Sequence, residues 1–199
     1  MKTEGGRDME ILLSVCLGIG LSAACGFKVF VPLLVMSAAS LSGYVTLSHG
    51  FQWIGTHSAF MAFGTATILE VIAYYIPWVD NFMDSIAAPV AVVAGTILTA
   101  SGIIHMSPLM KWTLAIIAGG GTAAIFHGAT TFVRGASSTI TGGLGNHAVA
   151  TTELGIALGL SLLAIALPLV SSIVVLVFLF LVAREGFQKL HKQMRPHSF

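Results

Sequence analysis

The chain has 199 residues, of which 56% are hydrophobic and only 9% are charged, and its mean hydropathy is +0.93. A soluble globular domain carries about 25% charged residues, so this composition excludes one. The formal net charge of +1 gives no strong field that would attract nucleic acid. The two cysteines, Cys16 and Cys25, fit neither a disulfide framework nor a zinc site. We therefore expect an all-α integral membrane protein with no cofactor, no metal and no nucleic-acid partner.

Six apolar stretches are long enough to cross a bilayer as helices, since a crossing needs about 20 residues. They are residues 11–27, 58–79, 86–106, 112–133, 148–167 and 168–184. The segment before the first stretch has mixed charges and no cleavage site, so we interpret that stretch as a retained helix and not a signal peptide. The predicted division is a cytoplasmic N-terminus (1–10), a membrane domain (11–184) and a basic cytoplasmic tail (185–199).

Two further apolar stretches do not fit this set of crossings. Residues 29–47 contain Pro32, and residues 135–145 are rich in glycine, with Gly142 and Gly143 adjacent. Proline lacks a backbone donor, and glycine lacks a side chain to cover its backbone. Both stretches are therefore predicted to be broken or re-entrant, which a membrane tolerates only where backbone is buried in protein or lines a watery cavity. A further helix break is predicted at Pro77.

Residues 11–106 and 112–184 show the same order of features. Each has an apolar helix, one cation (Lys28 or Arg134), a broken segment and a helix with one glutamate (Glu70 or Glu153). Three crossings per half predict a 3+3 inverted repeat, an arrangement found in many secondary transporters. The spacing from cation to glutamate differs between the halves, so the absence of a repeat stays an equal alternative.

Basic residues predict the orientation in the membrane. The residues after Ala183 are Arg184, Lys189, Lys192 and Arg195 against the single acid Glu185. Lysine and arginine are enriched on the cytoplasmic side, so the C-terminus is expected there. Six crossings return the N-terminus to the same side, and both termini are therefore expected to be cytoplasmic.

Charged residues inside the apolar stretches are the main candidates for function, because a charge near the bilayer centre costs a few kcal/mol. Glu70 and Glu153 lie within predicted helices, and Lys28 and Arg134 are the cations placed to pair with them. We expect the four to meet in a shared hydrated pocket halfway through the membrane. The alternative is that Lys28–Glu70 and Arg134–Glu153 only brace neighbouring helices.

Three more residues are assigned to the same ion or substrate pathway. Asp80 and Asp84 lie one helical turn apart near a helix start, where they either cap the helix or shape a cation or proton entrance. His127 follows the glycine run of residues 119–121 and is the histidine most expected to face the polar centre.

Three elements resemble the domain of unknown function 4126 family, small membrane proteins of bacteria and plants. They are G-F-K-V-F-V-P at residues 26–32, E-V-I-A-Y-Y-I-P-W-V-D-N-F-M-D at residues 70–84, and the glycine run leading to His127. The resemblance covers about residues 26–168. Lys28 stands where the family usually has arginine, which loses the bidentate fork, and Tyr74 where aspartate is common, which weakens any metal-binding interpretation. The family has no established activity. The expected location of the chain is a bacterial inner membrane.

The expected function is a small membrane transporter or channel for an ion or small solute, with protons as a candidate coupling ion. Membrane lipids are expected neighbours, and a homodimer is expected because one chain has few helices to enclose a pathway. A membrane-embedded enzyme or flippase acting on a lipid phosphate is the alternative, since cations beside carboxylates suit that chemistry. A non-catalytic assembly protein is the third. An enzyme is the less favoured class.

Overall fold

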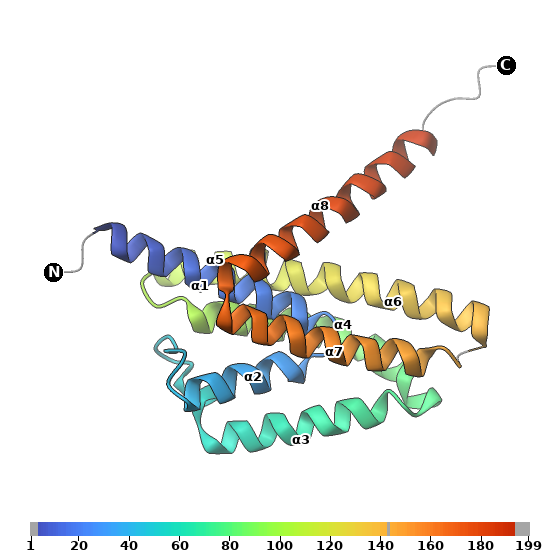
Figure 1. Ribbon diagram of the computed structural model, residues 1–199, viewed down its shortest axis with the longest axis horizontal. Coiled ribbons are helices and arrows are strands. Elements are labelled where there is room, and N and C mark those ends of the chain that lie inside the picture. The colour runs from blue at the N-terminus through green and yellow to red at the C-terminus, as the bar shows by residue number, and fades with distance from the viewer. Residues whose placement is uncertain (1–3, 143, 194–199) are drawn as a thin grey trace.

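The helices from α1 to α7 run back and forth in roughly the same direction, and α8 leaves them at a steep angle (Figure 1). Their bounds are α1 Glu4–Cys25, α2 Phe30–Leu41, α3 His57–Ala73, α4 Pro77–Gly102, α5 Pro108–Leu114, α6 Gly121–Thr141, α7 Asn146–Ala166 and α8 Pro168–Gln193. This computed structural model describes residues 4–142 and 144–193, and for several residues near the start of α4 and the end of α8 it describes the backbone alone. No strand occurs in the described ranges.

Local sequence explains where several helices begin and end. Pro77, Pro108 and Pro168 stand at the first positions of their helices, where no backbone donor is needed. Gly142 ends α6 with a left-handed φ of 62°, which glycine adopts without strain; Gly143 lies outside the described residues. Pro32 lies within the first turn of α2 and does not interrupt it. The predicted break at Pro32 is therefore displaced to the turn before α2.

Four helical stretches are long and apolar enough to cross a membrane. They are Gly5–Cys25, Pro108–Thr141, Asn146–Ala166 and Pro168–Glu185. The second is a continuous rod made of α5, a π-helical segment (Ala115–Gly120) and α6. Three shorter apolar helices accompany them: Phe30–Leu41, His57–Ala73 and Ile86–Gly102. The described helices are thus compatible with an integral membrane protein, and the six full-length crossings stay a prediction.

Contacts between distant segments define the two ends of the bundle. At one end, the Glu10 end, the Glu10 carboxylate lies 3.5 Å from the His105 ring just after α4. Lys111, in α5, donates to Ser48 there. At the other end, the Lys28 end, the Tyr75 hydroxyl lies 2.7 Å from the hydroxyl of Thr151 in α7. Counting the continuous stretch from α5 to α6 as one pass, successive passes therefore alternate in direction between the two ends (Figure 1).

This alternation changes three of the predictions. Residues 29–47 are not re-entrant, because α2 and the segment after it return the chain to the Glu10 end. Residues 135–141 continue α6 as helix and do not form a broken segment. In the described part of the chain, residues 11–106 then hold four passes and residues 112–184 three, so two matching halves are not seen.

The position of α8 follows from the same count. It begins at the Glu10 end, and Phe178 then stacks on Phe126 at 4.6 Å, beside Phe27 near the Lys28 end. The start of α1 and the later part of α8 thus lie at opposite ends of the bundle (Figure 1). The sequence predicted both termini on one side of the membrane because it predicted six crossings. That count did not include α2, a helix of only 12 residues, as a separate pass along the bundle.

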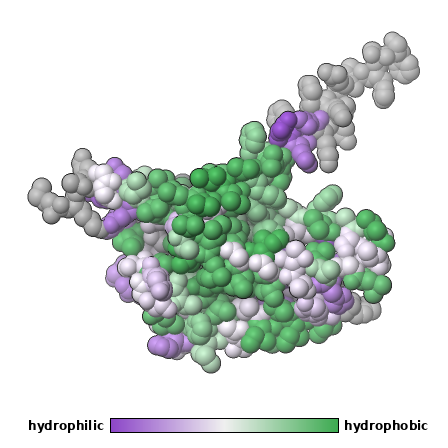
Figure 2. All heavy atoms as spheres, in the orientation of Figure 1, coloured by the Kyte–Doolittle hydropathy of each residue, from purple (hydrophilic) through white to green (hydrophobic). Residues whose placement is uncertain are grey.

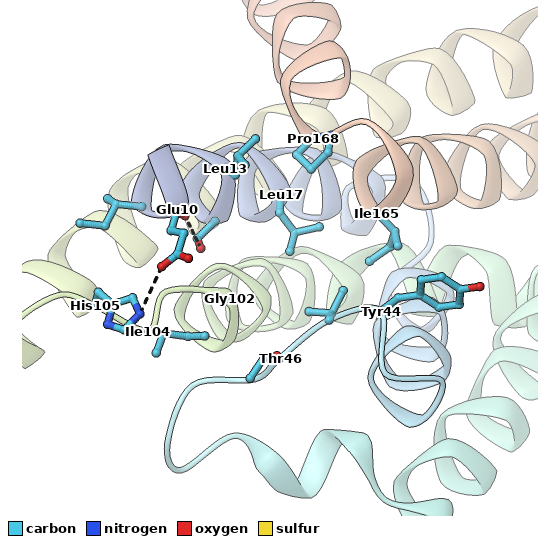
Figure 3. Close-up of a pocket in the computed structure, with 13 residues that line it drawn as sticks. Glu10, Leu13, Leu17, Tyr44, Thr46, Gly102, Ile104, His105, Ile165 and Pro168 are labelled. Atoms are coloured by element: carbon cyan, nitrogen blue, oxygen red, sulfur yellow. Dashed lines mark hydrogen bonds and ion pairs between the residues drawn. The ribbon is translucent and has the colours of Figure 1, made fainter. Parts of the chain in front are cut away.

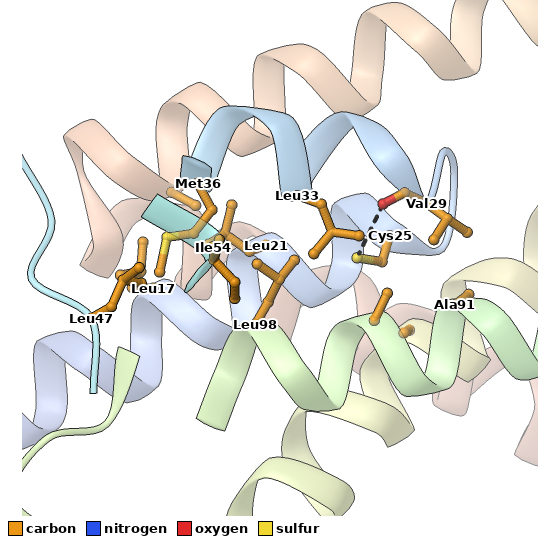
Figure 4. Close-up of a cluster of buried hydrophobic side chains, with 13 residues drawn as sticks. Leu17, Leu21, Cys25, Val29, Leu33, Met36, Leu47, Ile54, Ala91 and Leu98 are labelled. Atoms are coloured by element: carbon orange, nitrogen blue, oxygen red, sulfur yellow. Dashed lines mark hydrogen bonds between the residues drawn. The ribbon is translucent and has the colours of Figure 1, made fainter. Parts of the chain in front are cut away.

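The interior combines apolar side chains with small polar ones. Leu21, Met36 and Leu98 belong to the main apolar cluster, drawn in Figure 4. Beside it, the Ser22 hydroxyl lies 2.8 Å from the Gly95 carbonyl and 2.9 Å from the Thr99 hydroxyl. Apolar residues cover the middle of the outer surface, and hydrophilic residues gather toward the ends (Figure 2). A bundle with buried hydroxyls and an apolar exterior suits a lipid environment.

Candidate functional site

Four charged side chains from separate segments meet near the Lys28 end. They are Lys28 in the turn between α1 and α2, Glu70 on α3, Arg134 on α6 and Glu153 on α7. Their residues are 1%, 8%, 3% and 4% exposed, in that order. The sequence supplied these four as candidates, and the fold brings all four together.

The turn that carries Lys28 is held against α6. A Cβ added at Gly26 would overlap Phe126 Cβ and lie 2.8 Å from the backbone nitrogen of His127. Thr130 adds a long hydrogen bond of 3.4 Å to the Gly26 carbonyl. Glycine is therefore required for this close approach, and the approach fixes where the Lys28 side chain starts.

Glu70 caps the N-terminus of α2. Its Oε1 accepts from the Val29 amide at 2.8 Å, and its Oε2 accepts from the Phe30 amide at 3.1 Å. The first amides of a helix have no partner inside the helix, and the helix dipole favours a negative charge beside them. Valine at the N-cap has no polar side chain to serve them, so the carboxylate from α3 replaces a local cap.

Glu153 binds both cations. Arg134 Nε donates to Glu153 Oε1 at 3.0 Å, and Arg134 Nη2 donates to Oε2, which gives a two-point contact. Lys28 Nζ lies 3.4 Å from the same Oε2. The predicted Arg134–Glu153 pair is therefore present. The predicted Lys28–Glu70 pair is replaced, because the α2 N-terminus takes Glu70 and leaves Lys28 to Glu153.

Tyr74 is a member of this site that sequence reasoning missed. Lys28 Nζ lies 3.2 Å, and Arg134 Cζ 4.1 Å, from the centre of its ring. Cations are attracted to the face of an aromatic ring, strongly so without water, and Tyr74 is 5% exposed. Its position one helical turn after Glu70, on the same side of α3, was the available signal. We call Lys28, Glu70, Tyr74, Arg134 and Glu153 the charge centre.

The charge centre lies nearer one end of the bundle than its middle. Glu153 is about two turns, or about 10 Å, inside the start of α7. Glu70 is about one turn from the end of α3. The expected position halfway along the helices is therefore shifted toward the Lys28 end.

The remaining pathway candidates are placed differently. His127 is 6% exposed and lies two turns before Arg134 on α6. Its Nε2 has no hydrogen-bond partner among the residues that the structure describes, and its backbone carbonyl accepts from Thr130 and Thr131. Asp80 and Asp84 fall in the first turns of α4, but their side chains lie outside the described residues.

Two apolar crevices reach the charge centre from different sides. The first, of about 550 Å³, lies between α2, α3 and α4 and is lined by Glu70 and Tyr74 among apolar side chains. The second, of about 440 Å³, lies along α6 and α7 and is lined by Glu153 with Phe27 and Phe178. We call them the Glu70 crevice and the Glu153 crevice. Neither cation of the charge centre is among the described residues that line them.

A third pocket lies at the Glu10 end, away from the charge centre. Figure 3 shows Glu10 and His105 joined across it, with Tyr44 on its far side. Its volume is about 530 Å³. Neither there nor elsewhere in the described ranges do three or more His, Cys, Asp or Glu side chains form a group that could hold a metal ion.

The helices and the buried charges define the class: a helical protein compatible with an integral membrane protein, with ionisable side chains gathered inside the bundle. The chain belongs to the family described as Domain of unknown function (DUF4126), which matches residues 15–185. This match confirms the family resemblance of the sequence motifs. No curated protein and no solved structure matches the chain.

Proposed function

We propose that this protein is a small membrane transporter whose charge centre carries an ion or small solute across the bilayer. The observation that carries the proposal is the convergence of four buried charges beside the N-terminus of α2, with a crevice reaching each carboxylate from a different side.

Lys28 provides a second line of support. Its ammonium is buried, and Nζ has only the ion pair at 3.4 Å and the Tyr74 ring, with no hydrogen-bond partner in the described part of the chain. Buried donors usually have a hydrogen-bond partner, because a buried donor without one costs about 1–3 kcal/mol. A brace between α6 and α7 needs only Arg134 and Glu153, so the added cost of Lys28 favours a functional role.

The charge centre also suits proton coupling. Two cations and two carboxylates sum to zero, so a bound ion is best balanced in this apolar setting by a proton lost or gained at the centre. We propose Glu70 and Glu153 as the groups that carry the proton, because each lines a crevice.

The alternative of an enzyme or flippase for a lipid phosphate has less support. A phosphate group would need direct contact with Lys28 or Arg134. Both cations point to Glu153 and the Tyr74 ring, and the crevices present carboxylates instead.

Proton flux into liposomes tests the transport proposal. Purified protein is reconstituted with a pH-sensitive dye inside, and a valinomycin-driven potential is applied. The wild type is expected to conduct protons faster than empty liposomes, and Glu70→Gln and Glu153→Gln are expected to reduce the rate at least about tenfold. Glu10→Gln, a matched change at the other end of the bundle, should leave the rate unchanged. Wild-type rates equal to those of empty liposomes, or equal rates in all four proteins, would contradict the proposal.

The topology follows from the basic tail. We propose that the Lys28 end faces the cytoplasm, since the last turns of α8 and Arg195 beyond them together supply four basic residues against the single acid Glu185, and that the start of α1 lies on the opposite side of a bacterial inner membrane. Cysteines introduced singly at Gly5 and Gln188, both exposed, should react with an impermeant maleimide from opposite sides. Labelling of both from one side would exclude this topology. The homodimer stays a prediction.

A further inference from the structure

We propose that the Glu70 crevice binds a lipophilic cation, a molecule with a permanent or protonated positive charge surrounded by apolar groups. This inference names the substrate class of the charge centre, and its role in transport rests on the proposed function. The binding itself is argued from the crevice alone.

The size and lining of the crevice set the first limit. Its volume of about 550 Å³ lies within the range of small-molecule sites. Apart from Glu70 and Tyr74, the described lining residues are apolar, among them Phe30, Leu69 and Met83. A hydrated inorganic ion would leave this apolar surface uncovered, whereas an organic molecule would bury it. The occupant is therefore expected to be largely apolar.

The charge of the crevice sets the second limit. Glu70 is the one carboxylate among its described lining residues, and no lysine, arginine or histidine accompanies it there. Within the described residues, no cationic side chain forms an ion pair with Glu70, because Lys28 is engaged by Glu153. The negative charge therefore acts on the crevice without a cation paired to it, and it repels anionic amphiphiles.

The geometry of Glu70 suits it to this role. Two backbone amides, at 2.8 and 3.1 Å, hold its carboxylate in place and stabilise its charge. Each carboxylate oxygen has further lone pairs for a donor or cation. The Phe30 side chain lines the same crevice and adds an aromatic surface that attracts cations. A fixed carboxylate with an aromatic neighbour in an apolar crevice favours a cation with apolar substituents.

Two ions of the same shape and opposite charge test the inference. The full-length protein in detergent is titrated with tetraphenylphosphonium and with tetraphenylborate, and binding is measured by equilibrium dialysis. Tetraphenylphosphonium is expected to bind at least about tenfold more tightly. Glu70→Gln should remove at least about tenfold of that affinity, the loss expected for one charge-assisted contact. Glu10→Gln is the matched control and should bind as the wild type does.

A second variant addresses the crevice without changing the charge. Ala66 lies in the lining and is partly buried, so Ala66→Phe should fill the space and weaken tetraphenylphosphonium binding while Glu70 is intact. Helical circular dichroism and elution volume verify that each variant is folded. Equal affinity for the two ions, or unchanged cation affinity in both Glu70→Gln and Ala66→Phe, would overturn the inference and leave a crevice for lipid chains.

The two proposals can fail separately. Binding that depends on Glu70 without proton flux would exclude transport and keep the cation site. Flux that depends on Glu70 without cation binding would keep transport and exclude this substrate class.

Discussion

Each end of the bundle holds a glutamate beside a nitrogen-bearing side chain from another segment, arginine at one end and histidine at the other, and the two arrangements differ in burial. At the Lys28 end, the Glu153 and Arg134 side chains are 5% and 4% exposed. At the Glu10 end, the Glu10 and His105 side chains are 40% and 48% exposed and lie 3.5 Å apart. Water screens the second pair and surrounds either partner when the other leaves. Water does not reach the buried Arg134–Glu153 pair, so neither side chain can be solvated if the other is removed.

This difference shows that burial decides how strongly a glutamate depends on its partner. Glu10 precedes the apolar part of α1, where a charge is readily solvated. Glu153 lies within an apolar helix, where its partners are Arg134 from α6 and Lys28 from the turn before α2. We therefore expect substitutions at the charge centre to have large effects and equivalent ones at the Glu10 end to have small effects.

The largest effect is expected for Arg134→Met. The substitution leaves Glu153 with Lys28 alone, and removing one partner of a buried pair costs about 3–5 kcal/mol. The free energy of unfolding in mixed detergent–SDS micelles measures it. Arg134→Lys keeps the charge without the two-point contact and should lose less. A loss below about 1 kcal/mol for Arg134→Met would show that the pair is not buried as described.

A smaller effect is expected for Gly26→Ala. The added methyl group overlaps Phe126 and displaces the turn that carries Lys28, and overpacking of this kind costs about 1–3 kcal/mol. Gly155→Ala is the matched control, because a Cβ there meets nothing within 4 Å among the described residues. That variant should be neutral or gain up to about 1 kcal/mol in the same unfolding measurement. Equal effects of the two variants would contradict the close packing of the turn on α6.

Glu70→Ala tests the cap at the start of α2. Loss of a capping side chain costs about 0.5–2 kcal/mol, and hydrogen exchange should rise at the Val29 and Phe30 amides. Glu70→Gln keeps one carbonyl oxygen as acceptor and should protect these amides partly. Unchanged exchange in Glu70→Ala would mean that other groups serve the α2 N-terminus.

The smallest effect is expected for Glu10→Gln. Exposed ion pairs contribute about 0–1 kcal/mol, so the free energy of unfolding should change by less than about 1 kcal/mol. A loss as large as that of Arg134→Met would erase the contrast between the two ends.

Much of the candidate site could be predicted from single residues. Lys28, Glu70, Arg134 and Glu153 stand out because charges are rare in apolar stretches, and their rarity is a property of the sequence. Their pairing could not be predicted, since Glu70 has two possible partners, a cation and a helix N-terminus, and only the position of α2 selects between them. Tyr74 was missed because its position one helical turn after Glu70 indicates no role by itself until cations are found on its ring.

The differences between the predicted and the observed fold have a related cause. Helix starts at Pro77 and Pro168 are local events and could be predicted from proline chemistry. The pass made by α2 was missed because 12 residues are too few to cross a bilayer as a helix, and the chain completes that return with the segment after α2. Because this pass was not counted, the predicted position of the two chain termini relative to each other was wrong for the bundle. The predicted equal number of passes in the two halves was affected in the same way.

By itself the sequence determined an apolar, helical chain with a few costly charges, because hydropathy and composition are sums over residues that need no neighbours. Only the tertiary structure decided which charges share an ion pair, which one caps a helix and where the crevices open. Those outcomes depend on the distances between segments far apart in the chain, and helix packing sets these distances.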